Sequence, residues 1–278
     1  MYPSSKSSSF WESAAALTRS VCGSFSLVHD ARLISAASIN LLAASHDAQF
    51  SENAKALPAR TLTVKGKRIE CLRVADRLRR QNRTLVMEAA RNTAIISGKD
   101  IVISWRCSGY CRAPHEEALE FSIDADSELP FADLVCLAYD VGHDPNQTQR
   151  IRPVLVGLDA MSKKISVPFL RPLSMNERFS VLVTWTVPNC MARGVDYYTA
   201  TFSFDQESVP DCTTELVFLG NRPKWLEIWR SEAGGGSSKV ETLRPATIAN
   251  ERTEYRHTIR NSPASVAWIY LFERPAMN

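Results

Sequence analysis

The chain has 278 residues, of which 45% are hydrophobic and 23% are charged. These fractions are those of ordinary globular proteins, and they exclude global disorder, a collagen-like repeat and a small disulfide scaffold. The formal net charge of +3 is unevenly distributed, because residues 1–99 carry 15 Lys/Arg and 7 Asp/Glu whereas residues 100–278 carry 18 and 23. The change from +8 to −5 predicts a basic N-terminal region over residues 1–99 and a second domain over residues 100–278.

The N-terminal end and the cysteines predict a cytoplasmic location. Residues 1–9 are polar, which is typical of a disordered tail and not of a secretory signal. The longest weakly polar run, residues 31–44, is too short to cross a bilayer, so we expect no membrane span. Several of the seven cysteines lie in apolar runs, such as the one around Cys136. Buried free thiols in a reducing compartment are the ordinary explanation of this pattern.

The N-terminal region is predicted to be small, helical and of mixed α/β character. Apolar residues recur with a period near 3.6 over residues 24–44, which predicts an amphipathic helix, and residues 10–21 form a weaker helical pattern. Residues 61–70 are typical of a short hairpin with Gly66 in its turn. Residues 72–82 then predict a basic helix.

After residue 100 the apolar period changes to two, which is the period of half-buried strands. Residues 178–187 are the clearest case, with an apolar side chain at every second position from Phe179 to Val187. Further strands are predicted near residues 101–106, 119–124, 133–141, 151–158, 163–170, 197–204, 212–219, 225–230, 239–244, 253–260 and 265–273. Parallel strands need crossover helices, and none is expected here. The sequence therefore predicts a mainly β protein whose C-terminal domain is an antiparallel β-sandwich of Greek-key type.

The basic helix carries the sharpest binding pattern in the sequence. Arg73, Arg77 and Arg80 are spaced at i, i+4 and i+7 and share one face, while Leu72 and Leu78 lie on another. One face can then dock on the protein while the other meets phosphate groups. The candidate nucleic-acid contacts are Lys65, Lys67, Arg68, Arg73, Arg77, Arg80 and Arg83.

Gln81 and Asn82 add amide groups that can reach base edges. The alternative interpretation of the same segment is a solvated basic surface, or an arginine face paired with the acidic second domain.

Cys107, Cys111 and His115 have a spacing that resembles a metal site, in a segment expected to form a loop after a strand. Thiolates and imidazoles are zinc ligands, but the persuasive pattern has a second pair of ligands, which is missing here. No cofactor is therefore predicted, and zinc at these three residues is the alternative.

Trp225 and Trp229 lie on one face of a predicted strand, with Glu227 between them. Two indoles beside a carboxylate can stack a base or a sugar ring, which makes the pair a candidate ligand site. The alternative is that the pair covers the core or packs on a neighbouring domain.

No catalytic motif is evident in the sequence. There is no Gly-x-Ser-x-Gly elbow and no His-Glu-x-x-His, and the glycines at 234–236 lack the Lys-Ser/Thr ending of a phosphate loop. The leading hypothesis is a non-enzymatic intracellular recognition or sensor module that binds a protein partner or a small ligand through the β-sandwich. One alternative is a nucleic-acid-binding regulator that uses residues 65–91. Another is a hydrolase or metal-dependent enzyme whose site is assembled only in the fold.

Overall fold

The computed structural model describes residues 62–64, 67–69, 78–125, 129, 134–142, 148–158, 162–202, 204–220, 222–232 and 237–275. The chain has two compact units, Met1–Gln49 and Phe50–Asn278, and all described residues belong to the second. The predicted tail over residues 1–9 and the helices over residues 10–21 and 24–44 lie outside the described residues.

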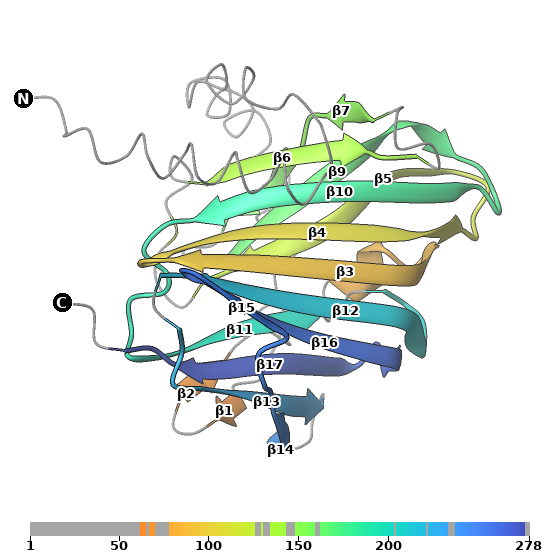
Figure 1. The fold of residues 1–278 in the computed structure, drawn as a ribbon. Coiled ribbons are helices and arrows are strands. Elements are labelled where there is room, and N and C mark those ends of the chain that lie inside the picture. Colours follow the sequence, from red (N-terminus) through yellow and green to blue (C-terminus); the bar gives the residue numbers. More distant parts are fainter. Residues whose placement is uncertain are drawn as a thin grey trace, which may run out of the picture. The chain divides into compact units, whose positions relative to one another are not determined.

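The largest sheet has eight strands in the order β15-β16-β12-β3-β4-β10-β6-β7 (Figure 1). Their bounds are β3 Leu85–Ser97, β4 Asp100–Cys111, β6 Val135–Asp140, β7 Gln149–Ile151, β10 Arg178–Val187, β12 Ser208–Leu219, β15 Thr247–Ala249 and β16 Arg252–Pro263. Most neighbours are antiparallel, but β3 and β12 pair in parallel, from Asp211 opposite Ala89 to Leu219 opposite Ser97.

Two smaller sheets complete the sandwich. One has the order β5-β9-β8, and the other has the order β11-β17-β13-β14. Their bounds are β5 Glu116–Asp124, β8 Val154–Leu158, β9 Ser162–Leu173, β11 Val195–Thr201, β13 Trp225–Glu232, β14 Ser237–Thr242 and β17 Val266–Glu273. A separate hairpin pairs β1 Leu62–Val64 with β2 Lys67–Ile69.

Both smaller sheets pack on the same eight-stranded sheet through aromatic side chains. From the three-stranded sheet, Phe121 lies between Trp105 and Trp185, with ring centroids 5.7 and 5.3 Å apart. From the four-stranded sheet, Phe272 meets Phe218 edge to face at 5.0 Å. All these rings belong to one buried cluster, so a single hydrophobic core joins the three sheets.

The predicted mainly β fold with a β-sandwich is confirmed, and its strands follow the period-two pattern. In β10, the inward side chains from Phe179 to Val187 are at most 8% exposed. The sheet begins earlier than expected, however, because β3 lies before residue 100 and is a central strand. Gly98, with a φ of 55°, lies in the tight turn between β3 and β4. The change in charge near residue 100 therefore falls inside a hairpin of the sandwich.

The predicted short hairpin around Gly66 is also present, since Val64 pairs with Lys67. Of the basic helix predicted over residues 72–82, the structure describes only the last part, where residues 78–81 form a single helical turn. In the described part of the chain, no helix has both the length and the apolar character that crossing a membrane requires.

Candidate functional site

The predicted nucleic-acid contacts are only partly described. Lys65, Arg73 and Arg77 lie outside the described residues, as do the side chains of Lys67 and Arg68. Their contact with nucleic acid therefore stays a prediction.

Arg80 and Arg83 are described, and both are exposed on a segment that is held firmly to the sandwich. Leu78 is buried in the protein at 2% exposure. Asn82 is 1% exposed, and its amide donates to the backbone oxygen of Glu120 at 2.6 Å and accepts from the backbone nitrogen of Glu120 at 3.0 Å. The expectation that Asn82 reaches base edges is wrong, because this amide is buried and pairs with β5.

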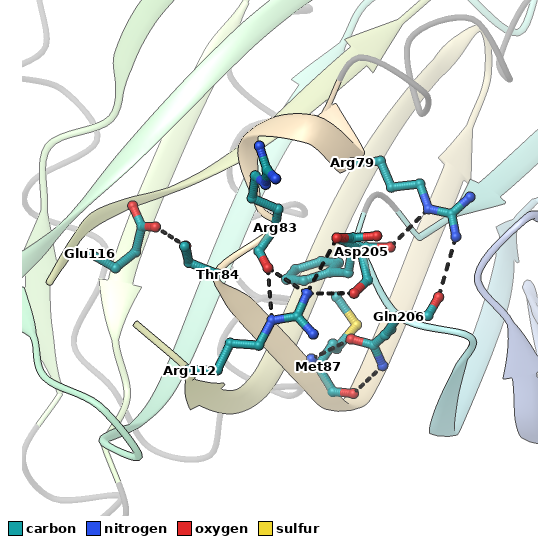
Figure 2. Close-up of polar contacts among 9 residues, drawn as sticks. Arg79, Arg83, Thr84, Met87, Arg112, Glu116, Asp205 and Gln206 are labelled. Carbon is teal, nitrogen blue, oxygen red and sulfur yellow. Dashed lines mark hydrogen bonds and ion pairs between the residues drawn. The ribbon is translucent and has the colours of Figure 1, made fainter. Parts of the chain in front are cut away.

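Two further arginines at this end of the sandwich bind backbone carbonyl groups (Figure 2). Arg79 donates to the oxygens of Phe204 and Gln206 at 3.1 and 3.3 Å. Arg112 donates through Nε to the oxygen of Arg83 at 2.8 Å and through Nη2 to the oxygen of Asp205 at 2.7 Å. Both guanidinium groups therefore hold loops in place, and this explains their position better than ligand binding does.

In the same region, the side chain of Gln206 makes hydrogen bonds to the backbone of β3, as a neighbouring strand would. The Gln206 amide accepts from the backbone nitrogen of Met87 and donates to its backbone oxygen, both at 2.8 Å (Figure 2). β3 is irregular here, with a register shift between Met87 and Ala89. The amide of Gln206 thus satisfies backbone groups next to the irregularity, before β12 begins to pair with β3.

The outer face of the eight-stranded sheet carries a group of arginines that the sequence did not single out. These are Arg91, Arg106, Arg178, Arg252, Arg256 and Arg260, accompanied by Glu88, Asp211, Glu215 and Glu254. Arg91 and Arg106 are exposed, and they stand directly opposite each other on β3 and β4. Like charges at directly opposite positions destabilise a sheet, so the stability of the fold does not explain this pair.

Glu215 binds two of these arginines. Its Oε1 accepts from Arg91 Nη2 at 2.8 Å and from Arg256 Nε and Nη2 at 2.9 and 2.7 Å, and its Oε2 accepts from Thr93 at 3.3 Å. Burial raises the pKa of Glu215, but the hydrogen bonds and charges of both arginines outweigh this and hold it below its ordinary value. The carboxylate is therefore ionised at neutral pH and shared by two cations.

The other acidic residues of this face are paired as well. Arg178 binds Glu88 at 2.7 Å, Arg252 binds Glu254 at 2.5 Å, and Arg260 binds Asp211 at 3.1 Å. Arg106 is the exception, since it has no ion-pair partner among the residues that the structure describes. This exposed arginine, directly opposite Arg91, is the strongest candidate for binding an anion.

The structure does not bring Cys107, Cys111 and His115 together as a metal site. Both cysteines belong to β4 and not to a loop, and they are four positions apart along the strand, which is roughly 13 Å. His115 is exposed and lies 3.1 Å from Glu117. Burial raises the pKa of Cys107 far above its ordinary value, which disfavours the thiolate that a metal would need. Within the described ranges, no cluster of three or more His, Cys, Asp or Glu side chains is arranged to hold a metal ion.

Trp225 and Trp229 are half-buried on one face of β13. Their indole nitrogens donate to Glu273 at 2.7 Å and to Glu227 at 3.1 Å, respectively. Both rings pack against a small cluster of buried residues on β17 that includes Ile269. These contacts fit the packing role, and ligand binding by the pair stays a prediction.

The two histidines in the described part, His115 and His257, do not pair with a serine or cysteine. His257 belongs to β16 and contacts β17, where its Nδ1 is 3.0 Å from the hydroxyl of Tyr270 and its ring meets Trp268 edge to face. Burial lowers the pKa of His257, while the charge of Glu241 raises it to a smaller degree. His257 is thus held neutral by its surroundings.

We expect this histidine to make the fold less stable in mild acid. Because the folded state disfavours protonation of His257, the unfolded state takes up more protons, and the free energy of unfolding falls as pH drops below about 6.5. Urea unfolding between neutral pH and mild acid measures this dependence. His257→Gln should show a flatter profile than the wild type, and the exposed His115→Gln serves as the matched control. Parallel profiles for His257→Gln and the wild type would contradict the expectation.

Comparisons with known proteins leave the family open. No family model and no curated protein matches the chain. Among solved structures, the M1 zinc metallopeptidase from Deinococcus radiodurans aligns with a TM-score of 0.42 and 14% identity over 68% of this chain and 42% of that one. A two-domain M1 zinc metallopeptidase variant bound to L-arginine gives 0.41 and 13% over 67% and 42%. The chain thus spans less than half the length of these enzymes, and likeness at this level carries no argument about function.

Proposed function

We propose that the chain is a non-enzymatic recognition module that binds an acidic segment of a protein partner on the outer face of its eight-stranded sheet. The observation that carries the proposal is the position of Arg106. It is exposed, it lies opposite Arg91, and it lacks an ion-pair partner in the described part of the chain. Guanidinium groups bind carboxylates in a planar, two-pronged geometry, so an acidic side chain is the natural partner.

The charge pattern favours an acidic protein segment over nucleic acid. A nucleic acid presents an unbroken row of phosphates, and the affinity of a protein for it depends on many Lys and Arg side chains that act together. On this face, Glu88, Asp211 and Glu215 lie among the arginines and would repel such a row. A peptide with separated carboxylates can meet Arg106 and avoid these acids.

The proposal includes a cytoplasmic setting. The five described cysteines are free, which fits a reducing compartment. Of the two described histidines, neither pairs with a serine or cysteine: His115 lies beside Glu117, and His257 lies beside Tyr270.

The test uses a labelled acidic peptide whose glutamates are separated by neutral residues and, for comparison, an oligodeoxythymidylate of similar charge. We expect the full chain to bind the peptide, and Arg106→Ala to weaken that binding about tenfold, because one charge-assisted contact is lost. Arg152→Ala is the matched control, since this exposed arginine follows β7, three strands from β4. Failure to bind the peptide, or equal loss with both variants, would overturn the proposal. Preferential binding of the oligonucleotide would favour the nucleic-acid alternative.

A further inference from the structure

Arg91, the neighbour of Arg106, already binds one anion, which is the carboxylate of Glu215. Glu215 accepts hydrogen bonds from Arg91, Arg256 and Thr93, so one carboxylate is bound by two guanidinium groups and a hydroxyl. Arg91 uses only its Nη2 for this contact. Among the described residues, its remaining donors and those of Arg106 have no hydrogen-bond partner.

Along the two strands, the neighbours of the arginine pair have short side chains. On one side of the pair Ala89 lies opposite Ser108, and on the other side Thr93 lies opposite Ser104. Across β10, the residue opposite Arg106 is the larger Leu182. The Cβ atoms of the two arginines are roughly 5 Å apart, as for any directly opposed pair. Two planar forks can therefore converge on one group from neighbouring strands.

A phosphate monoester fits this arrangement better than a single carboxylate does. It carries a charge of about −1.5 to −2 at neutral pH and presents three acceptor oxygens, whereas a carboxylate carries one charge and two oxygens. Two neighbouring guanidinium groups match that charge, and a dianion between them reduces the electrostatic repulsion between the two arginines. Both arginines lie on central strands, which fix the positions of their backbones.

We propose that Arg91 and Arg106 form a binding site for the phosphoryl group of a phosphorylated serine or threonine side chain. This inference rests on the proposed function, because the phosphorylated residue would belong to the acidic segment that the sheet binds. Arg106 supplies the free guanidinium group, and Arg91 is shared between the phosphoryl group and Glu215.

The experiment measures binding of the full chain to three acidic peptides that differ at one central position, which is threonine, phosphothreonine or glutamate. We expect phosphothreonine to bind at least about tenfold more tightly than threonine, and glutamate to lie between them. Arg106→Ala should remove the gain from phosphorylation. Arg106→Lys keeps the charge but loses the fork, and should remove most of the gain. Thermal unfolding shows whether each variant is folded, and Arg152→Ala is again the control.

The outcomes separate the two proposals. If the peptide with separated glutamates binds but phosphorylation adds nothing, the phosphoryl site is wrong and the proposed function stands. If phosphorylation raises affinity equally in the wild type and in Arg106→Ala, the phosphoryl group binds elsewhere and this inference fails. If the phosphopeptide binds through Arg106 while the peptide with separated glutamates does not bind at all, the site stands and the general recognition of acidic segments fails. If none of the peptides binds, both proposals fail.

Discussion

Replacing Gly109 by alanine is expected to destabilise the sandwich by about 3 kcal/mol or more, because a backbone atom occupies the space that the new methyl group needs. A Cβ at residue 109 would lie 1.9 Å from the carbonyl oxygen of Val86 and 3.1 Å from the Cα atom of Met87. A flexible side chain could move away, but these are atoms of the neighbouring strand. Met87 is in addition held on both of its backbone groups by Gln206.

Chemical unfolding of Gly109→Ala against the wild type measures the effect. Gly194→Ala is the matched control, since a Cβ at residue 194 meets no atom within 4 Å. We expect the control to differ from the wild type by about 0.5 kcal/mol or less. Equal stability of both variants would show that β3 and β4 can separate at little cost, and that the close approach at Val86 is not needed for the fold.

Gly109 belongs to the segment that the sequence predicted to be a loop. This segment, from Cys107 to Cys111, is part of strand β4. Within a strand, glycine often marks a place where another backbone approaches closely. The irregular pairing of β3 beside it creates that approach. A sequence alone does not show which strand will lie opposite, so the two interpretations could not be separated.

β3 was not predicted for a related reason. Its inward side chains begin with Leu85 and Met87, and after the register shift they continue with Ala90, Ala94 and Ile96. The shift moves the apolar pattern by one residue, and a strict period of two then fails along the strand. β10 has no such irregularity, which is why its alternation could be recognised directly.

The candidate site could be predicted only in part. The alternation near Trp105 placed Arg106 on the polar side of its strand, but no local pattern pairs residue 106 with residue 91. That contact depends on the register of two strands. The contact between Glu215 and Arg91 is still harder to predict, because it crosses a parallel pair of strands that local periodicity does not indicate. In contrast, Arg80 was found from helical spacing, which is a local property.

Gln206 should prove as important to the fold as a residue of the core, although it lies in a loop. Its amide makes three hydrogen bonds, two to Met87 and one to the backbone oxygen of Ser208 at 2.6 Å. Met87 is fully buried, so Gln206→Ala leaves its backbone nitrogen and oxygen without these partners. Each buried group left unsatisfied costs about 1–3 kcal/mol, and we expect a total loss near 3 kcal/mol.

Gln206→Glu makes the test more specific, because it keeps the size of the side chain and one acceptor but loses both donors. The new carboxylate would face the carbonyl oxygens of Met87 and Ser208, so this variant should be at least as unstable as Gln206→Ala. Gln81→Ala, at an exposed position, is the control. Urea unfolding gives the free energies, and hydrogen exchange at the Met87 amide reports the local contact. Wild-type stability together with unchanged protection at Met87 would mean that water or the chain itself replaces the glutamine. If protection is lost in both Gln206 variants and retained in the control, a single side chain performs the pairing that a strand performs elsewhere in the sheet.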